Sequence, residues 1–160
     1  MSLTLPTPRT PDPMSAPPLR WGVLGSGWIS SRFIETMHAN TRQRVVAVGS
    51  RTRERAEEFA ASIGAERAHG SYEELVADPE VDVVYVATPH SEHLDNALLA
   101  IAAGKHLLVE KAFTRNAGEA RQLLDAARAA GVSVLEAMWT RFLPDMDVVR
   151  QLLTDGALGE

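Results

Sequence analysis

The sequence predicts a doubly wound α/β fold, in which helices cover both faces of a parallel β-sheet. Short apolar runs of the strand type alternate with amphipathic helical segments from about residue 19 onward. The connections between successive apolar runs are too long for hairpins, which favours parallel strands joined by right-handed crossovers. The first apolar run also passes into the first helix through a glycine turn, and folds of this class often begin in this way.

The first strand–helix–strand unit of this pattern is well marked. An apolar strand at Trp21–Leu24 leads into the turn, and a helix starts near Gly27. The apolar run Arg44–Ser50 predicts a second, buried strand. Between them, apolar residues recur at every fourth position, as on one face of a helix: Ile29, Phe33 and Met37.

Capping signals mark the helices that follow. Gly64 closes a helix over residues 54–63, and the capping box Ser71–Glu74 opens a short helix that stops before Pro79. Asn116 caps a later helix, which Gly131 ends. The other predicted elements are strands at 81–87, 106–110 and 132–137 and helices at 91–103 and 144–153.

Length and composition exclude several classes of protein. The 160 residues suit one domain with a sizeable core, and the net charge of -5 argues against a dedicated nucleic-acid surface. Without cysteine, the chain has neither a disulfide framework nor a thiolate nucleophile, and its His, Asp and Glu residues lack the spacing of zinc ligands, so we predict no metal. Neither a membrane span nor the apolar core of a signal peptide is present, so we expect a cytoplasmic location.

The first 18 residues differ from the rest of the chain. They hold most of the 9 prolines and almost no periodic apolar pattern, which predicts a disordered, proline-rich tail over residues 1–18. Met14 and Ser15 repeat the opening Met1 and Ser2. Two explanations are open: translation starts at Met14, or Met14 is a chance methionine in a linker.

The glycine turn at residues 25–30 has the residue types that bind a pyrophosphate. Gly25 can take the tight turn, and Gly27 lets the backbone approach a phosphate at the helix N-terminus, where unpaired N–H groups and the helix dipole favour negative charge. Ser30 is small enough for close packing of the helix on the strand. Because similar turns occur in proteins that bind nothing, the prediction depends on the residues that follow.

The second strand ends in Ser50, Arg51 and Thr52, at the place where this fold class holds the adenosine ribose. An acidic residue there would bind the ribose 2′-hydroxyl and repel a 2′-phosphate. This chain has a guanidinium between two hydroxyls instead, which favours NADP over NAD, with NAD possible. The alternative is a solvated Arg51 beside a helix N-cap at Thr52.

Two later strands end at the same edge of the predicted sheet. Thr88 and Pro89 follow the strand at 81–87 and are candidates for the border of the nicotinamide half of the cofactor. His93 comes in the next helical turn, where a packing or capping histidine is the alternative to a proton shuttle. Glu110 and Lys111 end the strand at 106–110.

Lys111 is the candidate catalytic residue. A lysine in a cofactor cleft can stabilise a developing alkoxide or transfer a proton. The alternative is a surface lysine at a strand end, but Lys111 follows an apolar strand at the correct edge, so we predict the functional role. Further along, Met138 and Trp139 are candidates for cleft lining or for core, and Arg141 for a contact with substrate or a carboxylate.

These segments together resemble the glucose–fructose oxidoreductase, inositol dehydrogenase and MocA family over about residues 19–160. The stretches 110–114 and 136–142 are most similar to its branch of dimeric dihydrodiol dehydrogenases and NADP-dependent aldose dehydrogenases. The motifs occur in the family's order: Gly25-Ser26-Gly27-Trp28-Ile29-Ser30, Ser50-Arg51-Thr52, Thr88-Pro89 with His93, Ala103-Gly104-Lys105-His106 and Glu110-Lys111.

The resemblance implies a Rossmann domain at 19–141 that binds NADP, with Lys111 as the catalytic lysine near the reacting carbinol. Residues 142–160 would form a connecting helix and the lead-in to the family's C-terminal substrate domain, which we expect to be missing. Ala112 departs from the proline that commonly follows Glu-Lys, although this is usual for the branch. The cofactor-binding candidates are Gly25, Ser26, Gly27, Trp28, Ile29, Ser50, Arg51, Thr52, Thr88, Pro89, His93, Glu110 and Lys111.

The function that we predict is therefore that of the cofactor-binding half of an NADP-dependent oxidoreductase. The parent reaction would transfer a hydride between the nicotinamide and a secondary alcohol or hemiacetal carbon of a sugar or diol, and the chain alone would show little or no turnover. We expect a small-molecule substrate and a homo-oligomer, with neither nucleic acid nor membrane as partner. The alternatives are a non-catalytic nucleotide-binding module, such as a redox sensor subunit, and the product of a damaged gene.

Overall fold

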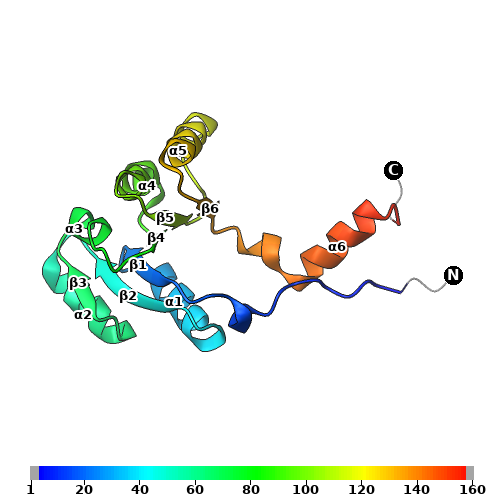
Figure 1. The fold of residues 1–160 in the computed structure, drawn as a ribbon, viewed down its shortest axis with the longest axis horizontal. Coiled ribbons are helices and arrows are strands. Elements are labelled where there is room, and N and C mark those ends of the chain that lie inside the picture. Colours follow the sequence, from blue (N-terminus) through cyan, green and yellow to red (C-terminus); the bar gives the residue numbers. More distant parts are fainter. Residues whose placement is uncertain (1–3, 158–160) are drawn as a thin grey trace. The chain divides into compact units, whose positions relative to one another are not determined.

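The computed structural model describes residues 4–157, which form two compact units (Figure 1). One unit comprises residues 16–137 and holds the whole sheet. The other combines the described parts of the segments 1–15 and 138–160. Of the predicted lead-in at the C-terminus, residues 158–160 lie outside the described part of the chain.

The larger unit is built on a six-stranded parallel sheet with the order β3-β2-β1-β4-β5-β6. Because β1 pairs with both β2 and β4, the direction of the strand order reverses beside β1, as in a doubly wound fold. The predicted fold class is confirmed. The strands are β1 Arg20–Leu24, β2 Arg44–Gly49, β3 Arg67–His69, β4 Val83–Val86, β5 His106–Val109 and β6 Val134–Glu136.

Helices cover both faces of the sheet (Figure 1). Helices α1 (Trp28–Asn40) and α2 (Arg53–Ile63) pack on one face, in a core that contains Val23 of β1. Helices α3 (Tyr72–Val76), α4 (His93–Ala102) and α5 (Ala117–Ala130) pack on the other, in a core that contains its neighbour Leu24. Successive residues of β1 thus enter opposite cores, as the alternation of side chains along a strand requires.

The predicted helix caps are confirmed. The side chains of Ser71 and Asn116 accept hydrogen bonds from the backbone N–H groups three residues later, at 3.1 and 3.0 Å. Gly64 and Gly131 end α2 and α5 in the left-handed conformation, with φ of 72° and 70°. An N-cap of this kind stabilises a helix by about 1 kcal/mol, so these boundaries are fixed locally by the sequence.

Three details differ from the prediction. The edge strand β3 was not predicted, because Arg67–His69 is short and carries no apolar run. Helix α4 begins at His93, after a 3-10 turn at His90–Glu92, and not at residue 91. In α1 the fully buried positions are Ser30, Ile34 and Met37, so Ile29 and Phe33 lie at the flank of the buried face.

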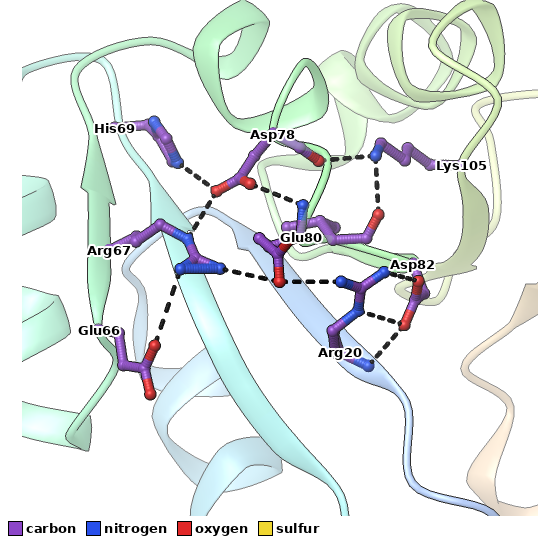
Figure 2. Close-up of polar contacts among 9 residues, drawn as sticks. Arg20, Glu66, Arg67, His69, Asp78, Glu80, Asp82 and Lys105 are labelled. Atoms are coloured by element: carbon purple, nitrogen blue, oxygen red, sulfur yellow. Dashed lines mark hydrogen bonds and ion pairs between the residues drawn. The ribbon is translucent and has the colours of Figure 1, made fainter.

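A polar network lies at the end of the sheet where strands β1 and β4 begin (Figure 2). The buried carboxylate of Asp78 accepts hydrogen bonds from Arg67 Nε and the Glu80 N–H, at 3.0 and 2.8 Å, and lies 3.0 Å from His69 Nε2. Lys105 Nζ donates to two backbone carbonyls of the same turn, those of Asp78 and Val81, each at 2.7 Å. The network therefore anchors β3 and the turn before β4 to one carboxylate.

Arg20 forms the second part of this network. Its guanidinium donates to both carboxylate oxygens of Asp82, at 2.9 and 2.6 Å, and to Glu80 at 2.9 Å. The Arg20 hydrogen bonds are the main reason that the pKa of Asp82 falls from 3.8 to about 2.

The smaller unit contains 3-10 turns at Pro13–Ser15 and Trp139–Phe142 and helix α6 (Pro144–Thr154), which was predicted at 144–153. Residues near the N-terminus contact this helix: the Arg9 N–H donates to the Asp147 carboxylate at 2.8 Å, and Gln151 Nε2 donates to the Thr7 carbonyl at 3.0 Å. No helix in the described part of the chain is long and apolar enough to cross a membrane.

Candidate functional site

A pocket of about 380 Å³ lies where β1, β2 and β4 end, beside the reversal of strand order. This is the position at which open α/β sheets bind their ligands. Seven of the sequence candidates line it: Gly25, Ser26, Gly27, Ser50, Arg51, Thr88 and Pro89. The structure therefore brings these seven candidates together at one edge of the sheet.

Gly25 makes the sharp turn at the end of β1. Its φ of +100° is a conformation that side chains rarely adopt, and a Cβ there would lie 2.7 Å from the carbonyl oxygen of Ala87. The Gly25 N–H also donates to the Gly49 carbonyl at 3.2 Å. The turn thus lies tightly against the ends of both neighbouring strands, and glycine is required by conformation and by space.

Gly27 has a different role. It is the N-cap of α1, its φ of -90° is ordinary, and no side chain satisfies the first N–H groups of the helix. A Cβ at Gly27 would meet nothing within 4 Å, so the space in front of this helix end is open. Free N–H groups, a helix dipole and open space are what a pyrophosphate needs.

Ser30 supports the glycine turn by packing and by a hydrogen bond. It is fully buried, and its hydroxyl donates to the Gly25 carbonyl at 2.8 Å. The small residue predicted here therefore packs closely and also satisfies a carbonyl of the glycine turn.

Arg51 and Arg55 both line the wall formed by the end of β2 and the first turn of α2. Thr52 lies between them and does not line the pocket; it caps α2 by accepting the Arg55 N–H at 3.4 Å. The pKa of Tyr72, on the same wall, is raised by burial, while the charges of Arg51 and Arg55 oppose the rise. Two guanidinium groups and a phenol therefore share this end of the pocket.

Arg55, Tyr72 and Glu92 are lining residues that the sequence did not reveal. One signal existed for Arg55, because a cation in the first turn of a helix opposes the helix dipole and needs a reason to be there. Glu92 lies in the 3-10 turn before α4 and brings a carboxylate to the pocket, where its charge helps to raise the pKa of Tyr72. Tyr72 and Glu92 reach the pocket only through the packing of α3 and α4 on the sheet.

Several sequence candidates lie outside the pocket wall. Trp28 is 76% exposed in the first turn of α1, whereas Ile29 packs against the core. His93 is fully buried, with Nε2 3.0 Å from the Thr88 carbonyl and Nδ1 2.9 Å from the Ala112 carbonyl. These are the contacts of the packing histidine that was the alternative for His93.

Glu110 and Lys111 follow β5, two strands away from β1 in the sheet. The Glu110 carboxylate accepts the Tyr85 hydroxyl at 2.6 Å and the Lys111 N–H at 2.9 Å. Lys111 itself is exposed. The pair thus consists of a fixed carboxylate and a side chain free to meet a ligand at the edge of the sheet where the pocket lies.

The residues present fit a phosphorylated dinucleotide. The pocket offers the open N-terminus of α1 and two guanidinium groups, from Arg51 after β2 and from Arg55 in the first turn of α2. Among residues 4–157, no group of three or more His, Cys, Asp and Glu side chains could hold a metal ion.

Comparison with known proteins gives a consistent result. The model of the GFO_IDH_MocA family, described as an oxidoreductase family with an NAD-binding Rossmann fold, matches residues 19–138. Trans-1,2-dihydrobenzene-1,2-diol dehydrogenase of Mus musculus is 43% identical over 144 residues, which are 89% of this chain and 43% of that protein. D-xylose 1-dehydrogenase (NADP(+)) of Hypocrea jecorina is 43% identical over 153 residues, 88% of this chain and 39% of that protein.

Solved structures show the same relationship. An NAD-binding oxidoreductase from Klebsiella pneumoniae matches with a TM-score of 0.81 and 34% identity, over 86% of this chain and 39% of its own. KijD10, a 3-ketoreductase from Actinomadura kijaniata in complex with NADP and TDP-benzene, matches with a TM-score of 0.78 and 33% identity. The match covers 88% of this chain and 43% of that chain. The chain thus spans about two fifths of the length of these relatives.

Proposed function

The chain belongs to this oxidoreductase family with its NAD-binding Rossmann fold, and from that premise we propose that it binds NADP in the pocket beside the switch point of the sheet. The observation that carries the choice of NADP is that Arg51, after β2, and Arg55, in the first turn of α2, both line the pocket, whereas Glu54 between them does not. A guanidinium can hold a 2′-phosphate through two parallel hydrogen bonds. The relative from Hypocrea jecorina is an NADP-dependent enzyme.

The parts of the cofactor would divide between the two ends of the pocket. The pyrophosphate would meet the N–H groups of α1 in the open space in front of Gly27. Arg51 and Arg55 would bind the 2′-phosphate, and Tyr72 would lie against the adenosine half. Thr88 and Pro89 would border the route toward the nicotinamide.

We further propose a role for Lys111 in the reaction of the whole protein. Bound NADP supplies or accepts a hydride, which the reaction would exchange with a secondary alcohol or hemiacetal carbon of a sugar or diol. The Lys111 ammonium would hold the substrate oxygen and its developing charge, or transfer its proton. The dehydrogenase names of the two curated relatives support this class of substrate.

A non-catalytic nucleotide-binding module is the second candidate, and it is favoured by the position of Lys111 outside the lining of the pocket. The chain covers 43% of one curated relative and 39% of the other. NADPH oxidation by the chain, alone and combined with the unmatched part of a relative, would decide between these candidates. Turnover in either sample favours the enzyme, whereas tight binding with no turnover favours the module.

Calorimetric titration of the chain tests the cofactor assignment directly. NADPH, NADH and 2′,5′-ADP are the three probes, because the last carries the 2′-phosphate without a nicotinamide. We expect NADPH to bind roughly tenfold or more tightly than NADH, as one extra charge-assisted contact predicts, and 2′,5′-ADP to compete with NADPH. Equal affinity for NADPH and NADH, or no binding of either, would overturn the proposal.

A further inference from the structure

We propose that His93 and Glu136 are positioning residues, which fix the backbone of the Lys111–Phe113 loop and thereby place the Lys111 ammonium. This inference rests on the role proposed above for Lys111. It assigns a function to two side chains that lie outside the pocket wall. It also gives His93 a part in the site without any transfer of protons.

The N–H groups of the loop are held by the carboxylates that end two adjacent strands. Glu110, after β5, accepts the Lys111 N–H at 2.9 Å. Glu136, the last residue of β6, accepts the Phe113 N–H at 3.0 Å. Both glutamates are partly buried. A hydrogen bond to a carboxylate is stronger than one between neutral groups, because the acceptor carries a charge.

The carbonyl groups of the loop face two histidines. His90 Nε2 lies 2.9 Å from the Lys111 carbonyl oxygen. His93 Nδ1 lies 2.9 Å from the carbonyl oxygen of Ala112 and 3.3 Å from that of Phe113. The two imidazole rings meet edge to face, with centroids 5.3 Å apart. Side chains from three parts of the fold thus contact the backbone from Lys111 to Phe113.

His93 also connects the loop to the pocket. Its second ring nitrogen, Nε2, lies 3.0 Å from the carbonyl of Thr88, and Thr88 is part of the pocket wall. The ring is fully buried, and an imidazole with one N–H donates from one nitrogen only, so one of these contacts is a hydrogen bond and the other is a close packing contact. One imidazole therefore sets the position of the Lys111 loop relative to the wall along which the nicotinamide would lie.

The arrangement explains how an exposed lysine can have a defined position. The Lys111 side chain is exposed, and a flexible four-carbon side chain does not fix its own amine. Its starting point, the Lys111 Cα, is fixed by the contacts on either side. A catalytic group must be placed to within about an ångström of the reacting atoms, and a fixed backbone helps the lysine side chain to achieve this.

The lysine content of the chain makes the proposal directly measurable. Lys105 and Lys111 are the only lysines in the sequence. Labelling with 13C,15N-lysine therefore gives two backbone amide signals and two sets of side-chain signals. The Lys105 N–H donates to the Ala100 carbonyl at 3.0 Å, away from the loop, and serves as an internal reference.

Two substitutions separate the two contacts of His93. The amide nitrogen of His93→Asn lies near the position of Nδ1 and can still donate to the loop, whereas that of His93→Gln lies near Nε2 and can donate to Thr88. We expect His93→Gln to speed hydrogen exchange of the Lys111 amide roughly fivefold, as the loss of one hydrogen bond predicts. We expect His93→Asn to restore near-native exchange, and Lys105 to be unchanged in both.

Glu136→Ala gives a second, independent variant at a strand end, in case substitutions of the buried histidine impair folding. It should speed exchange of the Lys111 amide in the same way. Ile101→Val, a buried change on the same helix as His93, is the control for a loss of general stability. Exchange at Lys111 that stays native in both His93→Gln and Glu136→Ala, or that rises equally in Ile101→Val, would overturn the proposal.

Addition of NADPH separates this inference from the proposed function. In the wild-type chain, NADPH should shift the Lys111 ε-methylene signal and leave that of Lys105 in place. In His93→Gln the shift should be at least halved while the dissociation constant for NADPH changes less than about twofold, because His93 does not line the pocket. If NADPH binds no variant, the proposed function fails, while the exchange rates still decide whether the loop is held as described. A full Lys111 shift in His93→Gln would contradict the positioning role alone.

Discussion

The Tyr85 hydroxyl donates a hydrogen bond of 2.6 Å to Glu110, and this contact joins the centre of the fold to the Lys111 loop. Tyr85 is fully buried in β4, where its ring lies 4.2 Å from that of Phe33. Glu110 in turn accepts the Lys111 N–H. A core aromatic residue thus orients the carboxylate on which the candidate catalytic residue depends.

Replacement of Tyr85 by Phe should therefore weaken both the fold and the loop. The variant keeps the ring but removes the donor to a carboxylate, and such a bond stabilises the folded state by about 2 kcal/mol. Urea denaturation should show that loss in the free energy of unfolding, with the slope unchanged. Phe33→Leu is the comparison variant, since it disturbs the ring contact that Tyr85→Phe keeps and leaves the Glu110 bond intact. A loss below about 0.5 kcal/mol for Tyr85→Phe would mean that the hydrogen bond contributes little.

Alkaline pH should destabilise the wild-type chain more than Tyr85→Phe. Burial, together with the adjacent Glu110, raises the pKa of Tyr85 well above 10.0. The folded state then keeps a proton that the unfolded state loses, so this stabilisation is complete below pH 10 and declines as pH rises further. The free energy of unfolding measured between pH 8 and pH 11 should fall more steeply in wild type. Parallel pH curves for the two proteins would contradict the prediction.

Acid should remove the contribution of the ion pair in Figure 2 between Arg20 and Asp82. Since the folded pKa of Asp82, about 2, lies below its ordinary value of 3.8, the stabilisation is present above that value and is lost as pH falls toward 2. Asp82→Asn should cost about 1 kcal/mol at pH 7, because the pair is partly exposed but bidentate. Its stability curve should meet that of wild type near pH 2. Equal stability of the two proteins at pH 7 would refute this account.

Gly25→Ala should lower stability, whereas Gly27→Ala should lower NADPH affinity. At Gly25 the new Cβ would lie 2.7 Å from the Ala87 carbonyl at a φ of +100°, so we expect a loss of stability of about 2 kcal/mol or more. At Gly27 the Cβ meets nothing within 4 Å, so thermal unfolding should change little while NADPH affinity falls, because the methyl group occupies the proposed phosphate space. A Gly27→Ala protein that binds NADPH with native affinity would place the phosphate elsewhere.

Arg51→Ala should raise the dissociation constant for NADPH far more than that for NADH. Loss of a charge-assisted contact to phosphate predicts a change of roughly tenfold to a hundredfold for NADPH alone. Arg55→Ala should show the same selectivity, and Arg128→Ala, on the exposed surface of α5, is the control. Equal losses of affinity for both cofactors would contradict this role and favour the alternative, in which Arg51 is a solvated arginine beside the Thr52 cap.

The parts of the fold that were predicted from sequence are those that local interactions determine. The caps at Ser71 and Asn116 each depend on a backbone N–H three residues away, and the turn at Gly25 depends on a φ that glycine adopts readily. Strand β3 was missed because it forms through pairing with β2 and through the contacts of Arg67 and His69 with Asp78. Those contacts are not visible in a periodic pattern.

The same reasoning explains what the sequence revealed of the site. Gly25, Arg51 and Thr88 each follow the end of a strand, so the rule that parallel strands end at one edge was enough to bring them together. Tyr72 and Glu92 lie in segments whose side-chain directions depend on how α3 and α4 pack. His93 was recognised as a candidate, but its burial and its contacts with Ala112 and Phe113 depend on how α4 packs against the loop after β5. Tertiary packing, and not local preference, decides such positions.

The reversal of strand order beside β1 has a consequence for the integrity of the sheet. Gly25, Arg51 and Tyr72 belong to the part of the chain that builds β1, β2 and β3, whereas Thr88 and Glu92 follow β4. A ligand that touches both sets crosses the seam where the two halves of the sheet are joined. Because the ligand would bind only when the two halves are joined, its binding energy would stabilise the folded domain. Removal of the dinucleotide would lower that stability again.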